Sequence, residues 1–281
     1  MIISASYRTD IPAFHAAWFQ KAWRAGFVSV RNPYGGDVRQ VDLIPAGVDG
    51  FVFWTRNPAP FLDNLDEIAH VHIPFYLTVT VTQYPRFLER SVPGLRQILP
   101  VLRELVRRWG RRVLVWRYDP ILLAGDMDAA WHRGNFAALA ADMAALTDAV
   151  VFSWMQPYAK TRRNLDKAGL DWRDPGNEEK RALLVDLAAI ARDQGLRPSL
   201  CSQPDLQGPA LDAARCIDAD RLSDLAGRAI AARIKGNRPG CLCAQAVDIG
   251  AYDTCAHGCV YCYAVRNPEA GKRGAAAGLP I

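Results

Sequence analysis

Three cysteines near the C-terminus have a spacing that suits an iron–sulfur cluster. They are Cys255, Cys259 and Cys262, arranged as C-x3-C-x2-C with the aromatic Tyr261 directly before the last one. Three thiolates this close together can hold three irons of a [4Fe–4S] cube and leave the fourth iron without a protein ligand. An iron with an open position can bind a substrate or cosubstrate, as in other metal sites that keep one position free. The spacing therefore predicts a [4Fe–4S] cluster on this triple.

Four further cysteines lie outside the triple. Cys241 and Cys243 form a C-x-C pair, and Cys201 and Cys216 complete the seven cysteines of the chain. Four is the right number for a second cluster or for a structural zinc ion. Alternatively, Cys201 and Cys216 are plain buried thiols, because an unpaired Cys packs like a small hydrophobic residue. The odd count, the chain length and an N-terminus without a secretory signal pattern favour a reducing cytoplasm over a disulfide framework.

The composition fits a globular protein with a sizeable core. The chain has 281 residues, half of them hydrophobic, and a formal net charge of +5. No uncharged apolar run approaches the roughly 18 residues that a membrane-spanning helix needs, so we expect no membrane partner. The modest positive charge is compatible with a nucleic-acid partner but does not require one, because arginine-rich surfaces are common without it.

Short apolar segments alternate with amphipathic helical stretches along most of the chain, which predicts parallel strands with right-handed crossovers. About eight strands in one domain of this size favour a closed or nearly closed barrel over an open sheet. We therefore predict a single-domain TIM-like α/β barrel over residues 1–270, followed by a flexible Gly/Ala-rich tail over residues 271–281. The expected strands are Ile2–Ser6, Phe27–Val30, Gly50–Trp54, Phe75–Thr82, Val113–Trp116, Ala149–Trp154, Pro198–Cys201 and Ala244–Ile249, and one helix is expected over Pro12–Ala25.

Polar residues follow several of these strands and precede a proline. Arg8 and Asp10 come after the first strand, and Arg117 and Asp119 come after the fifth. A barrel places its active site where the C-terminal ends of its strands meet, so we predict that these four residues are catalytic. Arginines there suit a small substrate with a carboxylate or phosphate, because guanidinium binds both bidentately. Two weaker candidates, since Asn-Pro is an ordinary turn sequence, are Arg31-Asn-Pro33 and Arg56-Asn-Pro58.

The cysteine triple with its aromatic residue resembles the radical S-adenosylmethionine (radical SAM) superfamily. The resemblance implies that Cys255, Cys259 and Cys262 bind a [4Fe–4S] cluster and that Tyr261 lies beside the adenine of S-adenosylmethionine. It also implies reductive cleavage of that cosubstrate, hydrogen abstraction from a substrate, and an electron donor such as a flavodoxin or ferredoxin. The amino and carboxylate groups of S-adenosylmethionine would then need polar partners, for which the candidates are Arg8, Asp10 and Arg117.

Longer segments resemble a bacterial family known as a domain of unknown function, DUF1848, which names no substrate. Radical SAM proteins usually carry the triple after the first barrel strand, whereas here only 19 residues follow Cys262. The two resemblances together predict a circularly permuted barrel, which closed barrels tolerate because their termini can lie close together. Its cluster-binding loop would cover residues 241–264. The segments that carry the second resemblance are Ser4–Pro12, Phe53–Pro58, Trp116–Pro120 and Asp248–Ala264.

Two other functions are compatible with the sequence. In the first, a structural zinc ion closes the barrel and the carboxylates of Asp10 and Asp119 carry out non-radical chemistry. This reading leaves Cys255 and Tyr261 without a role. In the second, the protein carries a cluster and binds nucleic acid, which predicts strong, salt-dependent binding. The four zinc ligands of the first alternative would be Cys241, Cys243, Cys259 and Cys262.

Overall fold

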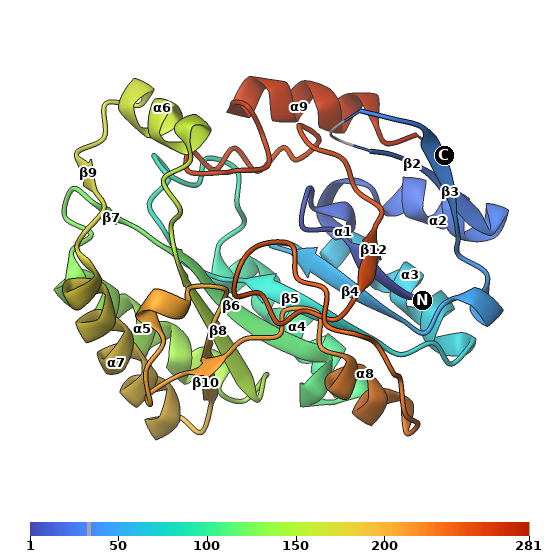
Figure 1. The fold of residues 1–281 in the computed structure, drawn as a ribbon, viewed down its shortest axis with the longest axis horizontal. Helices are drawn as coiled ribbons and strands as arrows, with labels where there is room; N and C mark the ends of the chain where they lie inside the picture. Colours follow the sequence, from blue (N-terminus) through green and yellow to red (C-terminus); the bar gives the residue numbers. More distant parts are fainter. Residues whose placement is uncertain (33–34, 281) are drawn as a thin grey trace.

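A parallel β-sheet of eight strands forms the centre of the protein (Figure 1). The computed structural model describes residues 1–32 and 35–280. Every pairing in this sheet is parallel, so the carboxyl ends of all its strands lie at one edge. Across the sheet the strands follow the order β11 (Asp212–Ala213), β10 (Arg197–Leu200), β8 (Ala149–Trp154), β6 (Leu114–Ile121), β5 (Phe75–Thr80), β4 (Gly50–Thr55), β1 (Ile2–Ala5) and β12 (Ala246–Asp248).

The central strands are covered on both faces, which explains their continuous apolar sequences. Alternate residues of a strand point to opposite faces. Ile3 and Phe51 belong to the large core that includes the apolar faces of the helices. Their neighbours Ile2 and Val52 belong to a second core, which is formed with residues 214–244. Burial on both faces is the usual condition of a parallel sheet, because the crossovers cover it.

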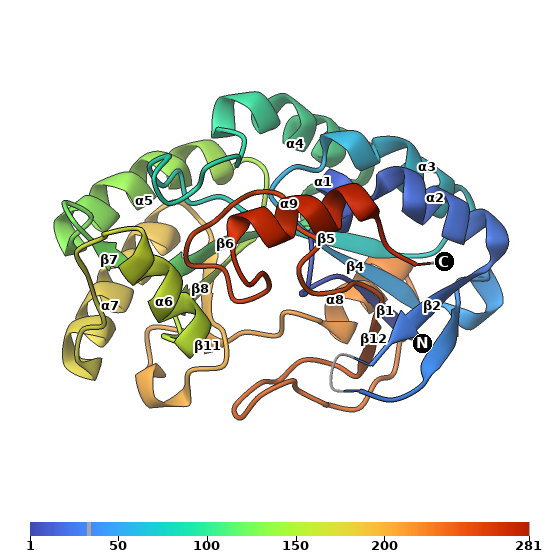
Figure 2. The ribbon, with the colours of Figure 1, turned by 90° about the horizontal axis from the view of Figure 1, so that it is seen from above.

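Helices occupy most connections between consecutive strands. Figure 2 shows α2, α3, α4 and α5 along one side of the sheet, and Figure 1 shows α9 beyond the ends of the strands. The helices are α1 (Ile11–Phe14), α2 (Ala16–Ala25), α3 (Leu62–His70), α4 (Leu95–Trp109), α5 (Ala129–Met143), α6 (Ala159–Lys167), α7 (Asn177–Asp193), α8 (Ala219–Ala226) and α9 (Pro268–Ala277). None of the helices in the described part of the chain is long and apolar enough to cross a bilayer.

Seven of the eight expected strands lie in the central sheet, but the strand expected at Phe27–Val30 does not. It forms β2 (Phe27–Arg31), which pairs antiparallel with β3 (Val38–Asp42) in a separate hairpin. Its residues alternate between buried and more exposed, as in a strand that is covered on one face only. The eighth position belongs to β11, whose two residues are exposed and gave no apolar signal. A third small sheet pairs β7 (Leu123–Ala124) with β9 (Trp172–Arg173).

The strand order matches the chain order, except that the last strand, β12, pairs with the first, β1. Among the described residues, β11 and β12 are the two edges of the sheet. The all-parallel α/β architecture is therefore confirmed, whereas the closed barrel stays a prediction.

The segment expected to be a flexible tail is largely helical, and this expectation was wrong for residues 271–277. Helix α9 begins with Pro268 in its first turn, and the side chain of Asn267 accepts a hydrogen bond from the Ala270 amide at 2.8 Å. A capping Asn followed by Pro is a strong helix start, which the Gly/Ala-rich composition concealed. The helix expected over Pro12–Ala25 is divided into α1 and α2 at His15. Two residues named above, Pro33 and Ile281, lie outside the described residues.

His132 on α5 is fully buried beside the sheet, and both of its ring nitrogens are hydrogen-bonded. Its Nε2 lies 3.0 Å from the Leu122 carbonyl, which can only accept, so Nε2 carries the proton. Its Nδ1, 2.8 Å from the Tyr118 hydroxyl, then accepts. Burial lowers the pKa of His132 to about 4, because a charged imidazole would lose its hydration there.

Acid should therefore weaken the fold through His132. The pKa of His132 is lower in the folded state than in the unfolded state, so between these two values the unfolded state binds the proton more readily. The folded state therefore has its full stability with respect to His132 above about pH 6.5 and loses stability as the pH falls towards 4. We expect the free energy of unfolding to fall by up to about 1.4 kcal/mol per pH unit in that window. Denaturant titrations of the wild type, His132→Gln and the exposed-histidine control His70→Gln measure this slope. An equal slope in the wild type and His132→Gln would contradict the assignment.

Candidate functional site

The cysteine triple lies on the loop between β12 and α9, at the carboxyl edge of the sheet. Cys259 is buried, and Cys255 and Cys262 are partly buried. Burial raises the pKa of all three thiols, to about 12 for Cys259, where the charge of Arg56 partly opposes it. Without a bound cation these groups are therefore neutral thiols at neutral pH, and binding a metal there must release protons.

The segment over residues 84–92 holds this cysteine loop by its backbone. The Ser91 amide donates to the His257 carbonyl at 2.9 Å, and the Val260 amide donates to the Leu88 carbonyl at 2.9 Å. Glu89 and Cys259 also form an isolated antiparallel bridge. The loop is therefore fixed on both sides of Cys259, although it contains no regular secondary structure.

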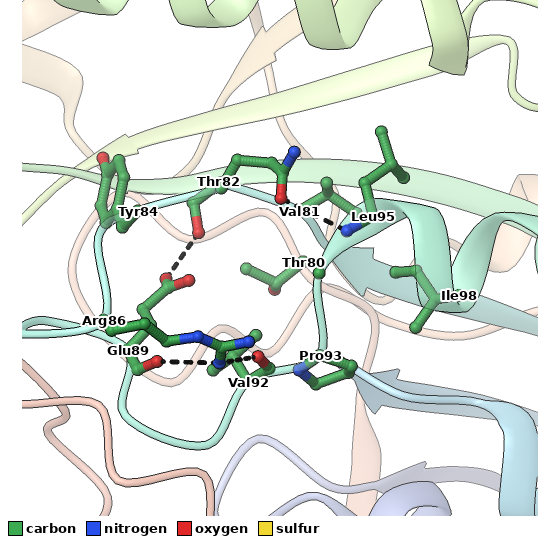
Figure 3. A pocket seen from close by; sticks show the side chains of 12 residues that line it. Thr80, Val81, Thr82, Tyr84, Arg86, Glu89, Val92, Pro93, Leu95 and Ile98 are labelled. Carbon is green, nitrogen blue, oxygen red and sulfur yellow. Dashed lines mark hydrogen bonds between the residues drawn. The ribbon is translucent and has the colours of Figure 1, made fainter.

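Arg56, Glu89 and Tyr261 form a buried polar network against the cysteine loop. Arg56 donates to Glu89 Oε1 at 2.9 Å and to the Tyr261 hydroxyl at 2.7 Å, and Tyr261 in turn donates to Glu89. Thr82 also donates to Glu89, as Figure 3 shows. The cavity behind Glu89, of about 80 Å³, has room for a few waters only and is far smaller than an ordinary ligand pocket.

Asp10 connects the cysteine loop to two strand ends. Its Oδ1 accepts from the Ala13 amide at 3.0 Å and so caps α1. Its Oδ2 accepts from the Arg56 amide and lies 2.8 Å from His257 Nε2. Both oxygens of this predicted site residue are thus already bonded, and its visible task is to position His257. The other ring nitrogen of His257, Nδ1, is buried and has no hydrogen-bond partner.

Arg8 forms a buried ion pair with Asp248, the last residue of β12. Arg8 Nε donates to Asp248 Oδ1 at 2.8 Å, and its Nη2 donates to the Asp248 carbonyl at 2.9 Å. The hydroxyls of Ser4 and Ser6 and the amide of Gly250 also donate to this carboxylate. Sequence reasoning did not select Asp248 as a site residue, because a single Asp at a weak strand end carries no distinctive spacing.

Arg117 and Asp119 lie together within β6, which continues to Ile121, and not after the strand as expected. Arg117 donates to Asp119 through both Nε and Nη2, and its guanidinium lies 5.1 Å from the centre of the Trp54 ring. Its remaining nitrogen, Nη1, donates to the Cys216 sulfur at 2.9 Å. The strand-end site is therefore linked directly to the second set of cysteines.

The four other cysteines gather in one place. Cys201 and Cys216 have sulfurs 3.3 Å apart, Cys216 contacts Cys243, and Cys243 contacts Cys241. Cys259 and Cys262 instead lie with Cys255, so the mixed zinc set considered from the sequence is divided between two groups. As the side chains of the described residues stand, no three or more His, Cys, Asp or Glu side chains are arranged to hold a metal ion.

The chain belongs to the DUF1848 family, a domain of unknown function, whose model matches residues 2–264. This match covers every strand of the central sheet and all three cysteines of the triple. No curated protein matches the chain. The resemblance to DUF1848 seen in the sequence is confirmed, and this family assigns no chemistry to the site. The resemblance to radical SAM proteins stays a prediction.

Breaking the Arg56–Glu89 pair should destabilise the protein strongly. Glu89→Gln leaves the Arg56 guanidinium, whose side chain is 11% exposed, without a carboxylate partner. We expect a loss of about 3–5 kcal/mol in the free energy of unfolding, because an uncompensated buried charge is costly. Chemical denaturation measures it, with Glu104→Gln as the control at an exposed ion pair, where little should change. Equal, small effects in the two variants would show that the buried network contributes no stability.

Helix α9 should leave the cysteine loop when its glycines gain a side chain. A Cβ at Gly271 would overlap the Cys255 carbonyl, and one at Gly274 would overlap the Asp253 carbonyl. We expect either Ala substitution to cost about 1–3 kcal/mol and to speed the reaction of Cys255 with a thiol reagent. The control is Gly134→Ala in α5, where a Cβ meets no neighbouring atom and should stabilise by about 0.5–1 kcal/mol. Unchanged thiol reactivity in both α9 variants would contradict this packing.

Proposed function

We propose that the protein is a radical SAM enzyme that holds a [4Fe–4S] cluster on Cys255, Cys259 and Cys262. The observation that carries the proposal is the position of three neighbouring thiols on one anchored loop at the carboxyl edge of a parallel sheet. Active sites of parallel α/β proteins lie at this edge. The donor set also fits, because thiolates are the usual ligands of such clusters. Each thiolate of a cube binds a different iron, so the three need not converge on one point.

The strand order supports a permuted barrel for this enzyme. If the chain is followed from β12 onwards, the cysteine loop comes after the first strand and the remaining strands follow in their spatial order, β1, β4, β5, β6, β8, β10 and β11. This is the order of a (β/α) barrel with an open seam between β11 and β12. The unusual position of the triple in the sequence then corresponds to the usual position in space.

When bound there, the cluster would supply reductive cleavage of S-adenosylmethionine and hydrogen abstraction from a substrate. The protein positions the loop through Asp10 and His257, and it sets the positive charge of Arg56 near Cys255 and Cys259. Tyr261 is buried and hydrogen-bonded to Arg56 and Glu89, so it fixes the loop in place. If S-adenosylmethionine binds here, Tyr261 would also border its adenine.

The remaining predicted residues suit an anionic group at the same edge. Arg8 and Arg117 each already pair with a carboxylate, so a substrate carboxylate or phosphate would share their donors or displace Asp248 or Asp119. Asp119 is the more exposed of these two carboxylates. Arg117 is therefore the better candidate for the carboxylate of S-adenosylmethionine or of the substrate. A flavodoxin or ferredoxin in a reducing cytoplasm would supply the electron.

Anaerobic reconstitution tests this function. We expect about four irons and four sulfides per chain and dithionite-dependent formation of 5′-deoxyadenosine from S-adenosylmethionine. Cys262→Ser should lose both. Cys216→Ser, a cysteine outside the triple, is the matched control and should keep its iron. Reconstituted wild type that contains no iron and forms no deoxyadenosine would sink the proposal and leave non-radical chemistry at Asp10 and Asp119. A cluster without deoxyadenosine formation would instead favour the cluster-bearing nucleic-acid-binding protein.

A further inference from the structure

A second group of cysteines lies in the second core, formed with residues 214–244, next to Arg117 and apart from the triple. Its members come from three separate chain segments: Cys201 follows β10, Cys216 follows β11, and the Cys241/Cys243 pair precedes β12. Three of them are buried and Cys241 is partly exposed. These segments lie apart in the sequence, so it is the fold that brings the four thiols together.

The four sulfurs form a row that curves back on itself. The row runs from Cys201 to Cys216, Cys243 and Cys241. The Ser202 hydroxyl lies 3.8 Å from the Cys201 sulfur and is also hydrogen-bonded to Cys241, so one side chain bridges the two ends. Four neighbouring thiols are the donor set of a tetrahedral thiolate site, although their side chains must still rotate to converge on one ion.

The spacing of the row favours a single ion over a second cluster. With metal–sulfur bonds of about 2.3 Å, neighbouring sulfurs of a tetrahedral site lie about 3.8 Å apart. The Cys201 and Cys216 sulfurs are 3.3 Å apart, so they are slightly too close and must open by a few tenths of an ångström. In a [4Fe–4S] cube each thiolate binds a different iron and the sulfurs lie much farther apart.

Every sulfur in the row faces a donor that is not a thiol. Arg117 donates to Cys216 at 2.9 Å, Arg238 donates to Cys201 at 3.3 Å, and the Ile217 amide donates to Cys243 at 3.4 Å. The Ser202 hydroxyl serves Cys241. Neutral thiols are weak acceptors, whereas metal-bound thiolates are regularly surrounded by such donors.

The loop that carries Cys241 and Cys243 is long and has little regular structure to hold it in place. The nineteen residues between Ala226, the end of α8, and Ala246, the start of β12, contain no helix or strand, only the isolated bridge between Ile234 and Ala244. Loops this long are uncommon in a compact domain unless something holds them. A Cβ at Gly236 would overlap the backbone of Cys241, so the loop turns tightly beside the pair.

We propose that Cys201, Cys216, Cys241 and Cys243 bind one zinc ion in a tetrahedral four-thiolate site. All four cysteines bind as thiolates and release whatever protons they still carry, which gives the zinc unit a net charge of −2. Arg117 and Arg238 face this charge, and Asp119 shares Arg117. The ion fastens the loop before β12 to the ends of β10 and β11, on the two sides of the open seam. It also fixes one nitrogen of Arg117 and leaves the other two facing Asp119.

The test measures zinc and iron separately on full-length protein purified anaerobically. We expect about one zinc per chain. Cys216→Ser should lose at least about nine-tenths of the zinc, whereas Cys262→Ser should keep the zinc and lose only the cluster iron. This pair of variants separates the zinc proposal from the proposed function, since each variant affects one metal. Cobalt(II) added to the zinc-free wild type should give the visible spectrum of a tetrahedral thiolate site.

Cys216→Ser could lose zinc simply because it misfolds, so a second variant keeps all four cysteines. Arg238→Gln changes a partly exposed donor and should weaken zinc binding by about tenfold in competition with a chromophoric chelator. Two results would overturn the proposal. One is zinc-free protein with a disulfide between Cys201 and Cys216, seen as a mass lower by two hydrogens. The other is a reconstituted wild type with about eight irons, half of them lost in Cys216→Ser.

Discussion

The carboxylate of Asp10 holds together three chain segments that share no secondary structure. It caps α1, accepts the Arg56 amide at the end of β4, and contacts His257 in the cysteine loop. A buried carboxylate requires donors on both oxygens, so these contacts form together. Asp10 therefore helps to set the position of the cysteine loop relative to the strand ends, together with the backbone bonds from residues 84–92.

Buried charge at this edge follows one rule, namely that each strand-end arginine is paired with a carboxylate. Arg8 has Asp248, Arg56 has Glu89, and Arg117 has Asp119. Two of the three partners lie far away in the sequence, so the pairs fasten distant segments as well as neutralise charge. Side chains held this way are preorganised, and an anionic ligand must compete with a carboxylate already in place.

The sequence predicted the parts of this molecule that have a local signal. Alternation of apolar runs and helical periods predicted the parallel sheet, and the resemblances predicted that the cysteine loop follows the last strand, where it does lie. The four cysteines outside the triple, among them Cys201 and Cys241, form one set in the sequence only by their number, because no spacing in the sequence shows that three loops meet. Arg56 was underrated for a related reason. Its Asn-Pro context is that of an ordinary turn, and only the fold brings Glu89 and Tyr261 to its guanidinium.

The pairing of the last strand with the first also has a consequence during synthesis on the ribosome. Ile2 of β1 is in register with Ala246 of β12, and the Arg8–Asp248 pair likewise joins residues that lie 240 positions apart in the chain. Until β12 emerges, β1 must wait with one edge uncovered, which exposes it to pairing with other chains. The cysteine loop follows β12 directly, so it emerges just after the strand that completes the sheet. A chain that stops before β12 thus lacks both the strand and the cysteine triple.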